Sequence, residues 1–253
     1  MENIGVILVA GGSGNRMGAA RPKQFMLLDG QPILTRTINT FAKALPMATV
    51  VVVLPEEHRI FWQNLSARFE TARHTVVAGG AERFHSVRNG LAALPPEVEL
   101  IAVHDGCRPL TSVELIHRTL EAAKLHHAAI PVVEVTDSFR QIEGEESHAV
   151  DRHSLRAVQT PQIFRAALLR KAYETEFSPL FTDDASVVEQ TGEGIFLCEG
   201  ERNNLKITTP DDLLIAQALL AAECEQRELH DEPTNEPIPH APSSECVCGG
   251  GYR

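Results

Sequence analysis

The stretch IGVILVAGGSGNRMG, from Ile4 to Gly18, decides the fold. Its first part, Ile4 to Ala10, is apolar and β-branched and stops at a glycine pair, which is typical of a strand buried on both faces. The glycine-rich part allows backbone N–H groups to approach an anion closely. It is no kinase-like P-loop, since no Gly-Lys-Ser/Thr follows, and Met17 stands where a dinucleotide fingerprint needs its third glycine. The stretch therefore predicts a strand followed by a phosphate-binding loop.

Further strands of the same character follow at Thr49 to Leu54, Thr75 to Ala78 and Leu100 to Val103. Helical patterns lie between and after them, in an apolar stripe that begins at Pro32 and in residues 56–69, 86–94 and 112–125. This alternation predicts an α/β fold with a mainly parallel sheet. Ligands of such sheets bind beyond the carboxyl ends of the strands. We therefore expect the site at the loops 11–23, 79–86 and 104–108.

The middle of the chain predicts a projecting β-arm at about residues 136–160. Strand patterns occur at Ala129 to Thr136, Phe139 to Ile142 and Ala149 to Val158, with Glu143-Gly144-Glu145-Glu146 as a hairpin turn. An exposed strand pair is only marginally stable alone. We therefore expect a second copy of the chain to cover the arm in a homodimer.

The C-terminal part predicts a last strand, a last helix and a tail. Asn204 to Thr208 is the expected strand, and Thr209-Pro210-Asp211-Asp212 starts a helix that runs to about Glu223. Residues 223–253 hold seven acidic and two basic residues, so they carry −5 of the total charge of −11. Their proline and glycine content and few apolar residues predict a disordered acidic tail, which leaves 1–222 as the single domain.

Composition narrows the function classes. A net charge of −11 over 253 residues disfavours nucleic-acid binding, because an acidic chain gains nothing from releasing phosphate counterions. The five cysteines are odd in number and form no disulfide framework, which favours a reducing compartment. With no signal-peptide pattern and no membrane-length apolar run, we expect a cytoplasmic protein without a membrane segment.

Two cations in the glycine loop stand out against the acidic background. Either Arg16 or Lys23 alone would more often be solvated surface. Together, in a loop that Pro22 keeps from becoming helical early, they favour phosphate binding, because a guanidinium bonds phosphate oxygens bidentately and an ammonium adds a compact charge.

Several blocks now carry a resemblance to a known family. They are Gly11 to Gly18 with Pro22-Lys23-Gln24, Gly79 to Arg83 with Ser86 to Leu91, Val103 to Pro109, Asp151-Arg152, Gln159 to Gln162, Thr182 to Ser186, and Asn204 to Thr208. In this order they resemble the 2-C-methyl-D-erythritol 4-phosphate cytidylyltransferases over about residues 4–222. The resemblance implies a Rossmann-like nucleotidyltransferase sheet. It also implies an enzyme of non-mevalonate isoprenoid biosynthesis that uses CTP, the alcohol phosphate and Mg²⁺, and releases 4-diphosphocytidyl-2-C-methyl-D-erythritol and pyrophosphate.

The resemblance also implies roles for individual residues. Catalysis at the triphosphate would involve Arg16, Lys23 and Lys206. The nucleotide would be bound by Ala10, Gly11, Gly12, Gly14, Gly80 and Ser86. The alcohol phosphate would be held by Arg108, Thr136, Arg152 and Thr160, of which Thr136 and Arg152 would come from the partner's arm. Asp105 would hold Mg²⁺. Some relatives carry an acid where this chain has Asn203, so Asp105 is the single carboxylate that we assign to the ion.

Two alternatives remain open at this level. A cytidylyltransferase for another polyol phosphate, such as ribitol 5-phosphate, would have an almost identical nucleotide half. A non-catalytic nucleotide-binding regulator would keep the fold, although retention of Arg16, Lys23, Asp105 and Lys206 together disfavours it. Turnover with each acceptor distinguishes these possibilities.

Overall fold

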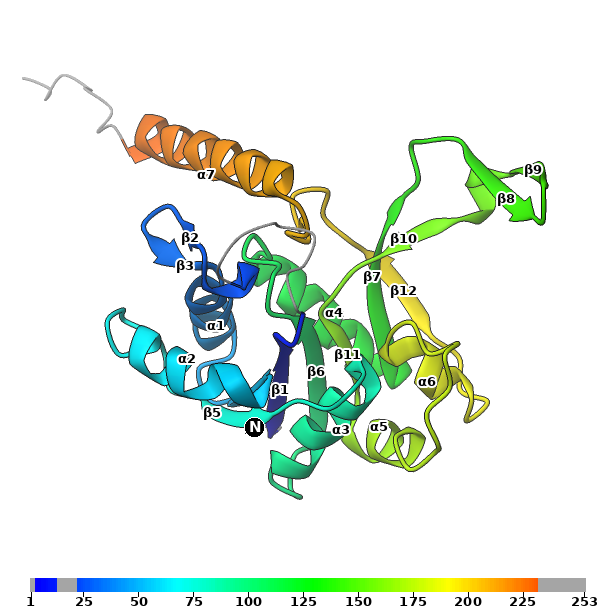
Figure 1. Cartoon of the computed structure of the whole chain (residues 1–253), viewed down its shortest axis with the longest axis horizontal. Helices are drawn as coiled ribbons and strands as arrows, with labels where there is room; N and C mark the ends of the chain where they lie inside the picture. The colour runs from blue at the N-terminus through cyan, green and yellow to red at the C-terminus, as the bar shows by residue number, and fades with distance from the viewer. Residues whose placement is uncertain (1–2, 13–21, 232–253) are drawn as a thin grey trace, which may run out of the picture.

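The computed structural model describes residues 3–12 and 22–231 (Figure 1). The predicted site residues Gly14 and Arg16 lie outside the described residues, as does the end of the predicted tail, 232–253.

An eight-stranded sheet forms the centre of the molecule, in the order β10-β7-β11-β6-β1-β4-β5 with β12 paired to β7. Its strands are β1 (Ile4–Val9), β4 (Thr49–Leu54), β5 (Thr75–Ala78), β6 (Leu100–Asp105), β7 (Ala128–Glu134), β10 (Arg156–Val158), β11 (Gln162–Arg165) and β12 (Phe196–Glu199). β1 pairs in parallel with β4 and β6, whereas β10 and β11 run antiparallel to their neighbours. The predicted mainly parallel α/β fold is confirmed.

Helices cover both faces of this sheet (Figure 1). They are α1 (Ile33–Ala44), α2 (Arg59–Ser66), α3 (Arg83–Ala93), α4 (Val113–His126), α5 (Ala166–Ala172), α6 (Asp184–Glu189) and α7 (Pro210–Asp231), with the short 3₁₀ turns η2 (Lys23–Phe25), η3 (Glu56–His58) and η4 (Arg152–Ser154). Successive strand side chains point to opposite faces. Leu8 of β1 therefore packs with Phe41 of α1, whereas Ile7 packs with Val87 of α3. This double burial explains the unbroken apolar run of β1.

The hairpin of β8 (Phe139–Glu143) and β9 (Glu146–Val150) forms a separate sheet that projects from the main body (Figure 1). Gly144 lies in the turn with φ +64, a conformation that glycine adopts without strain, so the predicted turn is confirmed. The predicted strand Ala149 to Val158 is wrong in its middle. Asp151 Oδ1 accepts a hydrogen bond from His153 N at 3.0 Å, which ends β9 and starts η4 before β10 begins.

A further short hairpin, β2 (Leu27–Leu28) and β3 (Gln31–Pro32), leads into α1. α7 contacts β2, and its Ala216 is buried in a small apolar cluster with Leu28, Ile33 and Ile207. None of the helices within the described residues combines the length and the apolar character needed to cross a bilayer.

The predicted strand Asn204 to Thr208 is wrong, because its polar groups pair with loops instead of a strand ladder. Ile207 N donates to Cys107 O at 2.9 Å, and Asn204 Nδ2 donates to Thr160 O at 2.8 Å. The strand nearest in sequence is β12, which the prediction missed. This irregular segment carries Lys206 across the end of β6.

α7 begins as predicted but ends later. Thr209 Oγ1 accepts from Asp212 N at 3.3 Å and Asp212 Oδ2 accepts from Thr209 N at 2.8 Å, which is the expected reciprocal cap. The helix continues to Asp231 instead of ending near Glu223. Residues 223–231 contain neither glycine nor proline, so nothing in that stretch breaks a helix.

Candidate active site

The loops after β1, β5 and β6 meet at one edge of the sheet, where the carboxyl ends of the parallel strands lie together. A cavity of about 300 Å³ opens there, and we call it the first cavity. Eight of the predicted site residues line it: Ala10, Gly11, Gly12, Lys23, Gly80, Ser86, Asp105 and Lys206. Segments far apart in the sequence are thus brought together.

A second cavity of about 250 Å³ lies beside the first. Two more predicted residues line it, Arg108 and Thr160, together with Gln159, Gln162, Thr182 and Asp183. Arg83, Asp105 and Lys206 line both cavities. Two ligands that occupied the two cavities would therefore meet at these three side chains.

Hydrogen bonds hold the backbone at two places beside the first cavity. Ser86 Oγ accepts a hydrogen bond from Gly80 N at 3.1 Å, and a Cβ at position 80 would collide with the Cβ of His85. After the end of β1, Gln24 Nε2 donates to Ala10 O at 2.8 Å. The backbone that borders the cavity is therefore fixed at both the β5 and the β1 side.

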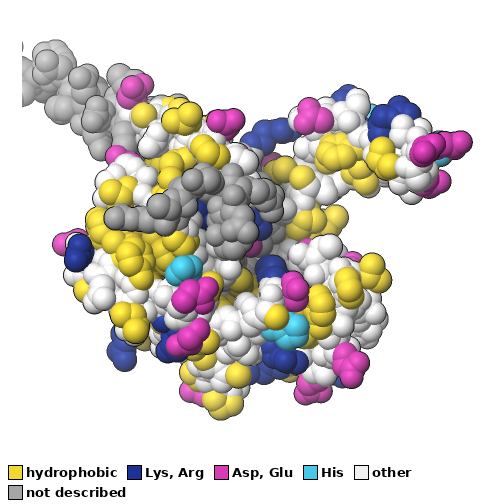
Figure 2. All heavy atoms as spheres, in the orientation of Figure 1, with side chains coloured by type: hydrophobic (Ala, Val, Ile, Leu, Met, Phe, Trp, Pro, Cys, Tyr) yellow, Lys and Arg dark blue, Asp and Glu magenta, His cyan; other side chains and the backbone are white. Residues whose placement is uncertain are grey.

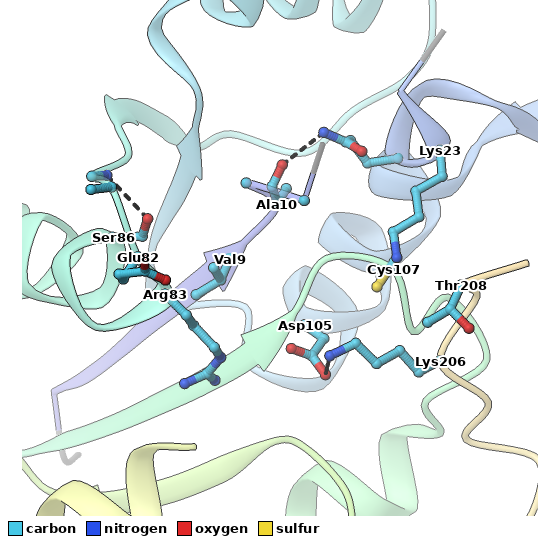
Figure 3. Close-up of a pocket in the computed structure, with 15 residues that line it drawn as sticks. Val9, Ala10, Lys23, Glu82, Arg83, Ser86, Asp105, Cys107, Lys206 and Thr208 are labelled. Atoms are coloured by element: carbon cyan, nitrogen blue, oxygen red, sulfur yellow. Dashed lines mark hydrogen bonds and ion pairs between the residues drawn. The ribbon is translucent and has the colours of Figure 1, made fainter. Parts of the chain in front are cut away.

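Asp105 lies at the centre of the site (Figure 3). Its Oδ2 pairs with Arg108 Nε at 3.1 Å and with Lys206 Nζ at 3.1 Å. Burial alone would raise the pKa of this carboxyl, but the charges of Lys206, Arg83 and Arg108 outweigh burial and hold the pKa well below its usual range. Asp105 is therefore ionised at every physiological pH.

Thr160 contacts Asp105 and His104 from the neighbouring strand end. Its Oγ1 accepts from Asp105 N at 3.1 Å and lies 2.9 Å from His104 Nδ1. Arg108 O, which can only accept, lies 3.4 Å from His104 Nε2. Nε2 therefore carries the imidazole proton, and Thr160 donates to Nδ1. The Thr160 hydroxyl thus fixes the strand end that presents Asp105.

His104 makes the folded state sensitive to acid. Burial lowers its pKa to about 3, from about 6.5 in an unfolded chain. Between these values the unfolded state binds more protons, so stability falls as the pH drops below about 6.5, by roughly 1.4 kcal/mol per pH unit from this group. We expect His104→Gln to lose this slope. The fluorescence of Trp62, the single tryptophan and fully buried, reports urea unfolding at each pH. Equal acid slopes in the two proteins would contradict the assignment.

Two predicted residues lie outside both cavities. Thr136 and Arg152 are exposed on the segments that lead to and from the hairpin, and Arg152 Nη1 donates to Thr136 O at 2.7 Å. Phe139 is 47% and Ile142 69% exposed on the same arm, whose surface mixes apolar and charged side chains (Figure 2). Within one chain, these two residues are not part of the site.

Arg83 lines both cavities, although no role was predicted for it from the sequence. It follows the Gly79-Gly80 pair at a strand end, a position that is itself a signal for ligand contact. Its partner Asp184 lies 101 positions further along the chain, and no local pattern predicts that pairing.

Asp105 is the predicted ligand of a metal ion. Among residues 3–12 and 22–231, no group of three or more His, Cys, Asp and Glu side chains is arranged to hold an ion. Asp105 Oδ1, in contrast to Oδ2, has no hydrogen-bond or ion-pair partner among the described residues. Mg²⁺ commonly takes one or two carboxylates and fills its shell with phosphates and water. A single free carboxylate oxygen beside a triphosphate fits this coordination preference.

Comparisons with known proteins agree with this geometry. The family model of 2-C-methyl-D-erythritol 4-phosphate cytidylyltransferase matches residues 4–222. A protein of that name from Bacteroides thetaiotaomicron is 48% identical over 216 residues, which cover 85% of this chain and 98% of the relative. One from Geobacillus kaustophilus is 42% identical over 224 residues, covering 87% and 98%.

Solved structures give the same result. 4-Diphosphocytidyl-2C-methyl-D-erythritol synthase from Anaerococcus prevotii superposes with a TM-score of 0.74 at 28% identity, covering 87% of this chain and 99% of that one. The 2-C-methyl-D-erythritol 4-phosphate cytidylyltransferase from Thermus thermophilus gives 0.70 at 35% identity, covering 87% and 100%.

Proposed function

This chain belongs to the 2-C-methyl-D-erythritol 4-phosphate cytidylyltransferase family, and from that premise we propose how its two cavities divide the reaction. The protein is a nucleotidyltransferase of isoprenoid precursor biosynthesis, whose substrates are CTP and methylerythritol 4-phosphate. The observation that carries the division is that Arg83, Asp105 and Lys206 border both cavities.

The first cavity takes CTP. Ala10, Gly11, Gly12, Gly80 and Ser86 would contact the nucleoside through backbone groups and one hydroxyl, as the resemblance implies. Lys23 would neutralise the triphosphate. Gly14 and Arg16 join this set on the resemblance alone, since they lie outside the described residues.

The second cavity takes the phosphate of methylerythritol 4-phosphate, with Arg108 and Thr160 in its wall. A phosphate oxygen attacks the α-phosphorus of CTP, the new P–O bond forms, and the bond to the β-phosphate oxygen breaks to release pyrophosphate. No strong base is needed, because the attacking phosphate is already ionised. Catalysis is then positioning and charge stabilisation, with Lys206 at the α-phosphate.

Enzymes of this family use a divalent cation, and we propose Mg²⁺ as the ion and Asp105 as its protein ligand. When bound, the ion would neutralise phosphate charge. We also propose that the enzyme works in the cytoplasm, where CTP is supplied.

The acceptor is tested directly by pyrophosphate release from CTP and Mg²⁺, with methylerythritol 4-phosphate compared with ribitol 5-phosphate. We expect release with the first only. Release with ribitol 5-phosphate alone would move the enzyme to polyol-phosphate metabolism. If neither acceptor gave pyrophosphate release while CTP still bound, the result would support a non-catalytic nucleotide-binding protein.

A homodimer completes the second cavity in this proposal. Thr136 and Arg152 line neither cavity of their own chain, and the hairpin beside them exposes Phe139 and Ile142. A partner's arm would bring the two residues to the acceptor phosphate and would bury the two apolar side chains.

Mixing two inactive variants tests this shared site. Lys23→Ala damages the first cavity of its own chain but leaves the arm intact, whereas Arg152→Ala damages the arm but leaves the cavities of its own chain intact. A mixed dimer therefore has one intact site, in which the Arg152→Ala chain supplies the cavities and the Lys23→Ala chain supplies the arm. With random exchange, about a quarter of all sites would be intact. We expect activity to return towards that level in a pyrophosphate assay. No recovery, with exchange verified by mass spectrometry, would show that each chain holds a complete site.

A further inference from the structure

Arg83 begins α3 at the boundary between the two cavities. Its side chain approaches from the side of α3, while Lys206 approaches from the far side of Asp105 (Figure 3). The side chain is 27% exposed, so it is neither solvated surface nor sealed in the core. Arg83 therefore has access to a ligand at this boundary.

One edge of the Arg83 guanidinium is fixed by a buried carboxylate. Its Nη2 donates to Asp184 Oδ2 at 2.6 Å, and the Asp184 side chain is 0% exposed. Tyr173 Oη donates to the other carboxylate oxygen at 2.6 Å. Gln162 Oε1 accepts from Asp184 N and Ala185 N, both at 3.0 Å. Both carboxylate oxygens and the backbone N–H of Asp184 are thus held, and Asp184 in turn fixes the orientation of Arg83.

The remaining donors of Arg83 have no hydrogen-bond partner among the described residues. A guanidinium has five N–H donors, and within the described residues the bond to Asp184 is the only hydrogen bond that Arg83 makes. Arg108 differs, because it already donates from Nε to Asp105 and from Nη1 to Asn204 O. Burying a carboxylate is costly unless it is paired. The arrangement around Asp184 positions a cation that lines both cavities.

We propose that Arg83 contacts the phosphate that is transferred between the two cavities and stabilises the negative charge that develops on it, with Asp184 and Tyr173 as its positioning residues. The inference rests on the proposed division of the cavities. The ligand chemistry is a phosphate oxygen at the boundary wall, on the side of Asp105 opposite to Lys206. Lys206 alone would stabilise that phosphate from one side, whereas Arg83 adds donors from the other.

The test uses turnover and binding together. Arg83→Gln alone would leave Asp184 buried and unpaired, so the double variant Arg83→Gln/Asp184→Asn removes both charges and keeps a hydrogen-bonding pair. We expect it to lower kcat by about thirtyfold, while the KM of each substrate changes by less than about fivefold. The Kd of CTP in the presence of Mg²⁺, measured by calorimetry without acceptor, should also change by less than about fivefold. Tyr173→Phe should lower kcat to a smaller extent.

Arg170→Gln is the matched control, because Arg170 donates to Leu91 O and Leu94 O and lines neither cavity. It should lower the thermal unfolding temperature and leave kcat unchanged. A folded double variant with wild-type kcat would overturn the proposal and leave Arg83 a structural role. If CTP affinity collapsed while kcat at saturation stayed normal, Arg83 would be a ground-state nucleotide contact, which also overturns it. Failure of the wild-type enzyme with methylerythritol 4-phosphate would instead concern the proposed acceptor.

Discussion

Replacing Lys206 by alanine is expected to lower kcat by at least about a hundredfold, the scale seen when one charge-stabilising donor is removed. Lys206 Nζ lies 3.1 Å from Asp105 Oδ2, and the side chain is 43% exposed in the wall common to both cavities. An ammonium that is half exposed in the free enzyme can turn to an incoming phosphate. Its loss would remove positive charge from the point of transfer.

The stability of the folded chain should change little in Lys206→Ala. Lys206 itself is 43% exposed, and Asp105 keeps Arg108 as its ion-pair partner, so no buried charge is left unpaired. Steady-state kinetics with both substrates and urea unfolding followed by Trp62 fluorescence separate the two effects. Lys206→Arg should recover part of the turnover, because the charge remains but its shape differs. Near-normal kcat in Lys206→Ala would place the transfer step away from the shared wall.

A matched control for Lys206→Ala is Lys124→Ala. Lys124 lies in α4, pairs with Glu121 at 2.8 Å, and lines neither cavity. Removing this charge alters the total charge equally but should leave kcat unchanged. A similar loss in both variants would indicate a general electrostatic effect of the acidic chain.

β1 and β6 were predictable because they are buried on both faces, whereas the edge strand β5 was predictable from its short β-branched run. β4 and β5 match their predicted bounds, and β1 ends one residue earlier than expected. Once these strands are parallel, the loops that follow them meet at one edge, which is why residues of the expected loops 79–86 and 104–108 line one cavity. This part of the site follows from periodicity and topology.

The second cavity could not be predicted in the same way, because long-range polar contacts build it. Asn204 Nδ2 bonds Thr160 O, and the Asn204 segment has the β-branched composition of a strand without pairing as one. Arg83 and Asp184 meet only in the folded chain, across 101 positions. Long-range side-chain contacts of this kind leave no periodic signal in the sequence.

β12 shows a signal that was present but short. Ile195 to Cys198 is a run of four apolar residues that follows Gly192 and Gly194. A run this short does not show whether the segment is a strand or a loop that packs against the core. The segment is a strand because it pairs in parallel with β7, and that pairing depends on where the rest of the fold places β7.

Asp105→Asn is expected to have the most severe consequence of any single change at the site. The substitution preserves shape but removes the charge that faces Arg108, whose side chain is only 10% exposed, and Lys206. A buried cation left without its partner costs about 3 kcal/mol or more of unfolding free energy. The free oxygen proposed for Mg²⁺ would lose its charge as well. We therefore expect kcat to fall by at least about a hundredfold in whatever fraction stays folded.

The pH dependence of this cost has a definite sign. Because the pKa of Asp105 is held below its usual range, its ion pairs contribute fully above the unfolded value of roughly 3.9, and the contribution is lost as the pH falls through the lower folded value. The stability difference between wild type and Asp105→Asn, from urea unfolding, should therefore be constant between pH 5 and 8. It should shrink only in stronger acid. In the unfolded state His104 takes up its proton inside the pH 5 to 8 window, whereas in the folded state it stays neutral there. This contribution is present in both proteins, so it largely cancels in the difference.

Mg²⁺ provides a readout that a purely structural role of Asp105 would not change. In the wild type, Mg²⁺ should tighten CTP binding, whereas Asp105→Asn should bind CTP with much weaker dependence on Mg²⁺. Calorimetric titration of CTP at several Mg²⁺ concentrations measures this coupling in both proteins. If the variant kept the full Mg²⁺ dependence, Asp105 would serve to orient Arg108 and Lys206, and the ion would be held by the triphosphate alone.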